Sequence, residues 1–122
     1  MEKYKLKDFA KWAKKERVSD KSLMEVVTEM SRGLLGDRLG ASIYKKRIKI
    51  EGRGKRGGGR VIVLFKDRDV TLFLYGYLKN EQGNISENEE RQLRIFANEF
   101  SKLSPLDRAK LRMERKLITI EE

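Results

Sequence analysis

The sequence contains no cysteine and no histidine. This absence excludes zinc sites built from thiolate or imidazole ligands, and it excludes cysteine nucleophiles and histidine general bases. Any catalytic chemistry must therefore use lysine, arginine, tyrosine, serine or carboxylate side chains. No disulfide can stabilise the fold, so the 122 residues must rely on a hydrophobic core, which a domain of this size can build.

Long apolar runs are also missing. No segment approaches the roughly 18 consecutive apolar residues of a membrane span, and the start, Met-Glu-Lys-Tyr-Lys-Leu-Lys, lacks the apolar core of a signal peptide. The sequence thus predicts a cytoplasmic protein with no membrane partner. Because it has no internal repeat and no linker, residues 1–122 are predicted to form a single domain.

Positive charge is what the sequence has in excess. It contains 29 lysines and arginines against 19 aspartates and glutamates, which gives a net charge of +10. Between Lys45 and Arg60, eight basic residues accompany one glutamate. Such a concentration of cations favours a polyphosphate partner, because phosphates supply most of the affinity in nucleic-acid binding. RNA or DNA is therefore the first partner that the sequence predicts.

Apolar residues at helical spacing predict two helices in the first third of the chain. The first covers residues 6–16 and is short and amphipathic, with Trp12 at the edge of its apolar stripe. The second begins at a cap formed by Ser19 or Asp20, and Gly33 is placed to end it.

Three β-strands are predicted next, over residues 42–50, 60–65 and 70–75. The last two are nearly continuous runs of β-branched and aromatic residues, and residues 66–69 form a short hairpin connection between them. The glycine-rich segment 52–59 is interpreted as a mobile loop between the first two strands.

The C-terminal third predicts two more helices. Ser86 and Glu89 form a capping box for a helix that runs to about Lys102, and Pro105 begins a weaker helix that runs to about Arg115. The tail 117–120 resembles a strand, and it either docks on the sheet edge or contacts a second chain. The order α-α-β-β-β-α-α predicts an α+β domain in which helices cover one face of a small antiparallel sheet.

One glycine pattern suggests a nucleotide cofactor but fails on its context. Gly52, Gly54 and Gly57 have the G-x-G-x-x-G spacing of the dinucleotide-binding fingerprint. That fingerprint requires a helix directly after the loop, whose N-terminus holds the pyrophosphate, whereas here a predicted strand follows. We therefore expect no cofactor.

The first predicted strand carries its cations on one face. Side chains alternate along a strand, so Lys45, Arg47 and Lys49 share a face opposite to Ile48 and Ile50, and Arg60 joins them from the next strand. This arrangement is interpreted as a phosphate platform. The alternative is a solvated surface and loop that only keep the protein soluble, which explains the glycines better than it explains the cations on the strands.

The third predicted strand ends in polar and aromatic residues. Tyr75 and Tyr77 project from one face, where each could fill the core or stack on a base. Lys79 and Asn80 follow at the strand's end, where side chains can reach a ligand without disturbing a core.

These segments together resemble the RelE/ParE superfamily of small bacterial toxins, and in particular its HigB-like branch. The resemblance extends from about Leu6 to the C-terminal tail. Its carriers, after the two helices, are the cationic strand 44–48, the turn into 59–62, the strand end 74–81 and the helix start 84–89. It implies a RelE-like fold.

The resemblance also implies a ribosome-dependent mRNA endonuclease that a cognate antitoxin holds inactive. In RelE-like members, lysines and arginines on the strands hold the phosphates and assist cleavage. By position these roles fall here on Arg47 or Lys49, on Arg60 and on Lys79, with Tyr77 as a further candidate. Further RNA contacts are expected from a second set of residues: Lys45, Lys46, Arg53, Lys55, Arg56 and Asn80.

The expected reaction needs neither histidine nor a metal ion. Internal RNA cleavage can use the substrate's own 2′-hydroxyl as nucleophile, so the protein must orient it, neutralise the phosphate and manage protons. The C-terminal catalytic tyrosine of some RelE members has no evident counterpart after Tyr77, which leaves the proton donor and acceptor open.

Two other functions fit the same charge pattern. The first is a nucleic-acid-binding module without catalytic activity. The second is a toxin of the ParE branch that acts on gyrase, although that branch usually lacks dense cations on its strands. The sequence predicts no oligomeric state.

Overall fold

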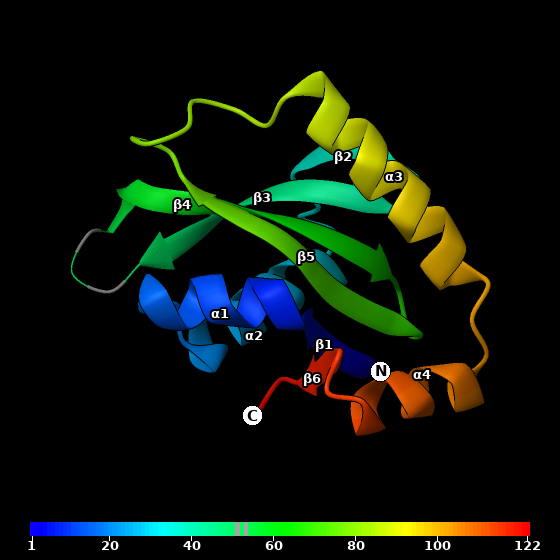
Figure 1. Ribbon diagram of the computed structural model, residues 1–122. Helices are drawn as coiled ribbons and strands as arrows, with labels where there is room; N and C mark the ends of the chain where they lie inside the picture. The colour runs from blue at the N-terminus through cyan, green and yellow to red at the C-terminus, as the bar shows by residue number, and fades with distance from the viewer. Residues whose placement is uncertain (51, 53) are drawn as a thin grey trace.

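The structure is a computed structural model that describes residues 1–50, 52 and 54–122, without the side chains at 54–57. It contains six strands and four helices (Figure 1). In chain order they are β1 (Glu2–Leu6), α1 (Lys7–Lys15), α2 (Asp20–Ser31), β2 (Asp37–Gly40), β3 (Ile43–Ile50), β4 (Gly54–Lys66), β5 (Val70–Leu78), α3 (Glu87–Ser101), α4 (Pro105–Met113) and β6 (Leu117–Thr119).

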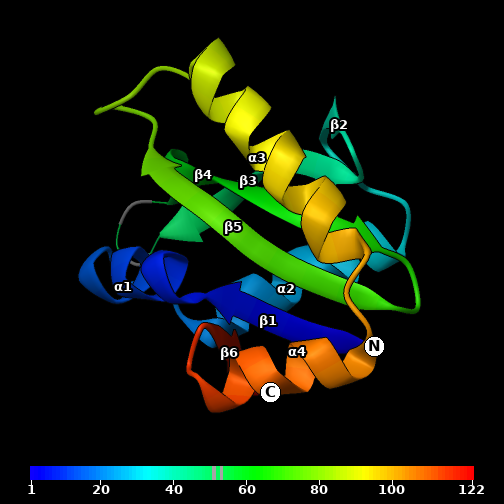
Figure 2. The same cartoon turned by 45° about the vertical axis from the view of Figure 1, so that its right-hand side comes forward.

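The strands form one sheet with the order β2-β3-β4-β5-β1-β6. Strands β2 to β5 are an antiparallel meander, β1 pairs parallel with β5, and β6 pairs antiparallel with β1. The three predicted core strands are thus confirmed within a sheet that is larger than predicted. The tail docks on the sheet edge, where β6 lies beside β1 (Figure 2).

Helices cover both faces of this sheet, so the prediction of one covered face was wrong. Helices α1 and α2 pack on one face of the sheet, and α3 crosses the opposite face, which is in front in Figure 2. Val61 and Val63 of β4 join the core under α1 and α2, whereas Ile62 and Leu64 join the core under α3. Because β4 and β5 are apolar on both sides, both of their faces need cover.

The helix boundaries follow the capping residues that the sequence predicts. The Ser19 side chain accepts a hydrogen bond from the N–H of Ser22, and Ser86 and Glu89 form the capping box of α3. Gly33 follows α2 with a φ of 92°, which favours glycine. In the part of the chain that is described, none of these helices has the length and apolar character needed to cross a bilayer.

The glycine-rich segment differs from its prediction as a mobile loop. Strand β4 begins at Gly54, so the backbone from Gly54 to Gly59 already belongs to the sheet. The pairing with β3 is irregular here, since Ile48 lies opposite Gly59 and Ile50 opposite Gly54. A Cβ atom at Gly59 would lie 2.9 Å from the carbonyl oxygen of Tyr77 in β5, so the close approach of β4 to β5 requires glycine at this position.

A second glycine seats α1 on the sheet. A Cβ atom at Gly76 of β5 would lie 2.3 Å from the ring of Trp12, which packs directly over the strand. The Trp12 ring also lies 5.5 Å from the ring of Phe9, between centroids. Helix α1 therefore packs against the C-terminal part of β5.

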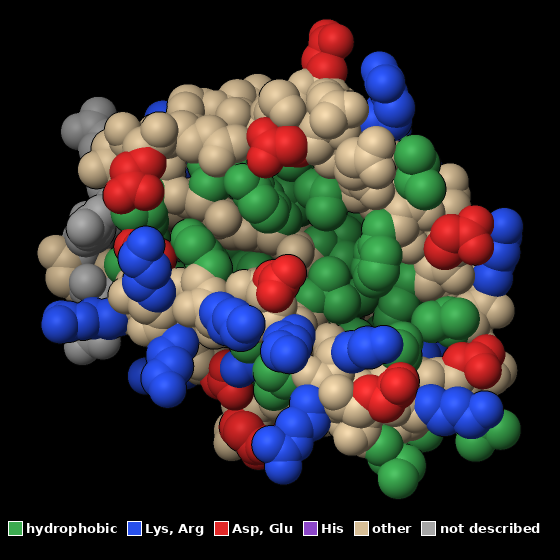
Figure 3. All heavy atoms as spheres, viewed as in Figure 1, with side chains coloured by type: hydrophobic (Ala, Val, Ile, Leu, Met, Phe, Trp, Pro, Cys, Tyr) green, Lys and Arg blue, Asp and Glu red, His purple; other side chains and the backbone are tan. Residues whose placement is uncertain are grey.

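An apolar groove opens between α3 and α1 on the face shown in Figure 3. Its volume is about 290 Å³, and its apolar lining comes from Leu6, Phe96, Phe100, Leu111 and Leu117. Basic side chains gather along its α1 side (Figure 3). This groove is apolar, whereas a second cavity, the cleft described in the next subsection, has a polar lining.

Candidate nucleic-acid interface

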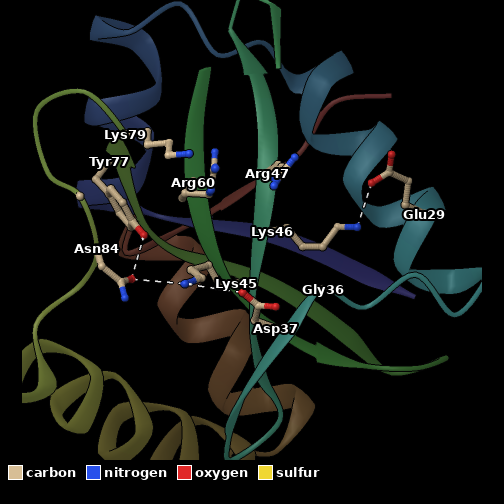
Figure 4. A pocket seen from close by; sticks show the side chains of 11 residues that line it. Glu29, Gly36, Asp37, Lys45, Lys46, Arg47, Arg60, Tyr77, Lys79 and Asn84 are labelled. Carbon is tan, nitrogen blue, oxygen red and sulfur yellow. Dashed lines mark hydrogen bonds and ion pairs between the residues drawn. The ribbon is translucent and has the colours of Figure 1, made fainter. Parts of the chain in front are cut away.

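A cleft of about 450 Å³ opens where β3, β4 and β5 meet the segment that connects β5 to α3 (Figure 4). Its described lining includes five cations and two carboxylates. The lining residues are Glu29, Gly36, Asp37, Lys45, Lys46, Arg47, Arg60, Tyr77, Lys79, Gly83 and Asn84. The cleft thus brings together six of the residues that the sequence analysis singles out.

Three of these residues form a row across the sheet. Arg47 lies directly opposite Arg60 on the neighbouring strand, and Arg60 lies directly opposite Tyr77. Opposed residues project from the same face, and neighbouring strands are about 4.8 Å apart. Both guanidinium groups can therefore reach a single phosphate.

The two arginines have no acidic partner among the residues that the structure describes. Among the described residues, no carboxylate forms an ion pair with Arg47, Arg60 or Lys79. Arg60 donates to the carbonyl of Gly59 next to it, at 3.1 Å. Like charges that face each other across a sheet destabilise it. The row is thus unfavourable in the free protein, and an anion bound between the arginines would relieve it.

Lys45 occupies the next position on the same face of β3. Its Nζ donates to Oδ1 of Asn84 at 3.3 Å and lies 3.6 Å from Oδ2 of Asp37. The Tyr77 hydroxyl donates to the same Asn84 oxygen, also at 3.3 Å (Figure 4). Asn84 therefore links a cation and a phenol at one wall of the cleft.

Tyr77 is a buried residue whose side chain lines the cleft. Burial raises the pKa of its phenol, and the positive charge of Arg60 partly opposes this rise. At neutral pH the phenol is therefore protonated and can take part in hydrogen bonds as donor or acceptor.

Lys46 lines the cleft but is bound to the protein itself. It is 9% exposed, and its Nζ lies 2.9 Å from Oε1 of Glu29 and donates to the carbonyl of Leu34 at 2.8 Å. The alternation of β3 places it on the face toward α2, with Ile48 and Ile50. Its charge thus joins β3 to α2, which makes it a weaker candidate for RNA contact than Lys45.

The other candidates lie elsewhere. Lys49 is exposed at the irregular end of β3 and does not line the cleft, and Asn80 is exposed in the turn after β5. Arg53 lies outside the described residues. The backbone at Lys55 and Arg56 belongs to β4, but their side chains lie outside what the structure describes.

Two polar residues of the cleft were missed by sequence reasoning. Asn84 lies two residues before the Ser86 cap, so its turn position was visible, but only the return of the chain over the sheet brings it to Tyr77. Asp37 belongs to β2, which has too few β-forming residues to be predicted. Gly36 precedes it with a φ of 75°, and a Cβ there would lie 2.3 Å from the carbonyl oxygen of Lys45.

The arrangement can neutralise a phosphate and offer hydroxyl and amide groups to a bound chain. Within the described residues, no group of three or more acidic side chains is placed to hold a metal ion. The groups that line the cleft are guanidinium, ammonium, phenol and amide groups, together with the carboxylates of Glu29 and Asp37.

The sheet, its helices and the cleft at one end of the sheet define an α+β protein of RelE-like fold. Residues 1–120 match the family model described as RelE toxin of RelE / RelB toxin-antitoxin system. The protein therefore belongs to the RelE toxin family, and it is the toxin of a toxin-antitoxin system with a cognate antitoxin as its partner. The resemblance seen in the sequence is confirmed at this level, and the HigB-like branch stays a prediction.

Proposed function

We propose that this toxin inhibits translation as a ribosome-dependent mRNA endonuclease and that the cleft holds the scissile phosphate. One observation carries the proposal: Arg47 and Arg60 face each other without an acidic partner among the described residues, in a row with Tyr77. A fold gains nothing from two opposed arginines. A phosphate between them turns the repulsion into two charge-assisted contacts.

The proposed reaction is an internal transfer within the RNA. The 2′-hydroxyl attacks the adjacent phosphorus and loses its proton, and the bond from phosphorus to the 5′-oxygen breaks. The leaving oxygen takes up a proton, so the products are a 2′,3′-cyclic phosphate and a 5′-hydroxyl. Arg47 and Arg60 stabilise the charge that develops on the phosphate oxygens, which is the largest contribution that such a site can make.

Proton transfer falls to the remaining groups of the cleft. Tyr77 carries a protonated phenol beside Arg60, and Lys79 lines the cleft from the end of β5. We propose these two as the candidate proton donors and acceptors. Lys49 lies outside the cleft, so we assign it to the RNA that extends from the site.

The ribosome supplies a second polyphosphate surface. The cations around Lys49 and the segment 53–56 would meet ribosomal RNA and steer the toxin toward it, because a basic surface accelerates association with an anionic partner. The antitoxin would prevent activity by competing with this association.

Induced expression in bacterial cells tests the proposal. Wild-type protein should stop growth and produce cuts in a translated message, as detected by primer extension. Arg60→Ala should lose both effects, whereas Arg91→Ala, which removes an exposed arginine of α3 outside the cleft lining, should retain them. Cuts at the wild-type level with Arg60→Ala would overturn the assignment.

The other functions give different results in the same experiment. A binding module would arrest growth without cuts and would bind RNA with a strong dependence on salt. A gyrase-directed toxin would induce a DNA-damage response and leave messages intact.

A further inference from the structure

Asn84 is a convergence point of hydrogen bonds in the cleft. Its Oδ1 accepts from the N–H of Ile85 at 2.8 Å, from the Tyr77 hydroxyl at 3.3 Å and from Nζ of Lys45 at 3.3 Å. Because all three neighbours are donors at these contacts, the oxygen of the amide must face them. The amide nitrogen points away from Tyr77 and Lys45 (Figure 4).

The backbone holds Asn84 in place independently of the cleft. Ile85 beside it is 7% exposed and belongs to the core under α3, and Ser86 caps that helix. The carbonyl of Asn84 accepts from Nε2 of Gln82 at 3.1 Å, and Gln82 in turn accepts from the Tyr75 hydroxyl at 3.2 Å. The amide is thus fixed before any ligand arrives.

The fixed Oδ1 of Asn84 determines the direction in which the Tyr77 hydroxyl hydrogen points. The hydroxyl hydrogen of Tyr77 is committed to Asn84, so the phenolic oxygen faces a ligand as an acceptor. The N–H of Ile85, which donates to Asn84, also interacts with this oxygen and lowers the pKa of the phenol, so one lone pair is left for a donor in the cleft. RNA brings a suitable donor that DNA lacks, the ribose 2′-hydroxyl.

We propose that Tyr77 and Asn84 form a reader of the ribose 2′-hydroxyl, in which Asn84 is a positioning residue that commits the phenolic hydrogen. The phenolic oxygen then accepts from the 2′-hydroxyl of the nucleotide whose phosphate lies between Arg47 and Arg60. This inference rests on the proposed function for the location of the phosphate. It adds a reason why the cleft selects RNA over DNA, which cations alone cannot do.

Binding of short oligonucleotides tests the reader without requiring cleavage. The probes are a single-stranded RNA and a DNA of the same sequence, and the readout is the ratio of their dissociation constants. A net hydrogen bond to the 2′-hydroxyl corresponds to a preference of about three- to tenfold for RNA in the wild-type protein. Tyr77→Phe should abolish this part of the preference while leaving DNA binding unchanged.

Three further variants separate positioning from a structural role. Asn84→Ala should reduce the RNA preference, and it should have no further effect in the Tyr77→Phe background, because it acts through Tyr77. Asn84→Asp keeps the acceptor, so it should weaken RNA and DNA binding equally and preserve their ratio. Asn88→Ala, an exposed asparagine of α3, should match the wild type.

Each outcome decides the inference separately from the proposed function. Equal affinity of the wild-type protein for RNA and DNA overturns it, and so do additive effects of Asn84→Ala and Tyr77→Phe on the ratio. A wild-type protein that prefers RNA through this pair but cuts no message supports the reader and overturns the nuclease instead.

Discussion

The arginines at the two ends of the sheet differ in whether a described acid pairs with them. At the β1–β6 end, Arg108 is buried and lies 3.2 Å from a carboxylate oxygen of Glu2 and 3.4 Å from one of Asp69. At the cleft, Arg47 and Arg60 oppose each other, and no described acid pairs with either. The arginine that supports the fold thus comes with its acids, whereas the two arginines that we propose as ligand-binding residues have no described acid beside them.

The same distinction applies within a single strand. Lys46 lies in the cleft, yet it is paired with Glu29, whereas its neighbour Arg47 points to the other face and forms an ion pair with no described acid. Lys46 thus resembles Arg108, because each forms an ion pair that joins two parts of the fold. Position near the cleft is therefore a weaker sign of function than the absence of a partner.

The largest stability effect is expected at the paired end. Arg108→Ala removes two ion pairs and a buried side chain, and it should lower the free energy of unfolding by about 2 kcal/mol, because hydrogen bonds to charged groups are worth about 1.5–3 kcal/mol. Urea unfolding at neutral pH measures this loss. The matched control is Lys102→Ala, which removes an exposed pair with Glu99 and should change stability by less than about 0.5 kcal/mol. Equal losses for both variants would contradict the distinction.

In the cleft, removing an arginine is expected to increase the stability of the fold. Arg47→Thr removes one of two opposed positive charges and places a good strand former in β3, so it should raise the free energy of unfolding by about 0.2–1 kcal/mol. The same variant should bind RNA more weakly. A clear loss of stability in urea would mean that Arg47 has a partner that supports the fold.

Salt dependence should sharpen the comparison further. Each phosphate contact that is lost should reduce the slope of log K against log salt by about 0.7 for single-stranded RNA. Arg47→Ala should show this reduction, whereas Lys3→Ala, at the paired end beside Glu122, should keep the wild-type slope. An unchanged slope for Arg47→Ala would remove this arginine from the interface.

The smallest effect concerns an acid beside the cleft. The N–H of Ser86 donates to Glu89 and lowers the pKa of its carboxyl below the ordinary 4.5. The carboxylate therefore contributes stability above pH 4.5, and this contribution is lost as the pH falls through the lowered pKa.

Glu89→Gln keeps a capping side chain but removes this charge. It should cost less than about 1 kcal/mol at pH 7, and the difference from wild type should vanish in acid. Unfolding free energies measured across this pH range check the prediction. A difference that persists unchanged in acid would show that the charge has no part in it.

Local signals in the sequence predicted much of the fold. The caps at Ser19 and Ser86 and the apolar runs of β4 and β5 depend on neighbouring residues, and these elements were confirmed. Strands β1 and β6 depend instead on pairing between the two ends of the chain, which no local pattern specifies. The alternation of Tyr4 and Leu6 with lysines was the only local sign of β1.

The cleft could be predicted only in part for the same reason. The alternation of β3 correctly separated Lys45 and Arg47 from Ile48 and Ile50. The register of β3 against β4 could not be read from this alternation. The opposition of Arg47 to Arg60 and the contact of Asn84 with Tyr77 both join segments that are distant in sequence. Such contacts carry the proposed chemistry and appear only in the folded chain.

The most direct test measures stability and cleavage on one purified variant. Arg60→Ala should unfold in urea within about 0.5 kcal/mol of the wild type. It should cut a ribosome-bound message at least about 100-fold more slowly, as expected when a main electrostatic contact to the transition state is removed. A variant that is clearly destabilised, or one that is stable and cuts at the wild-type rate, would contradict the claim that the unpaired arginines serve the RNA phosphate.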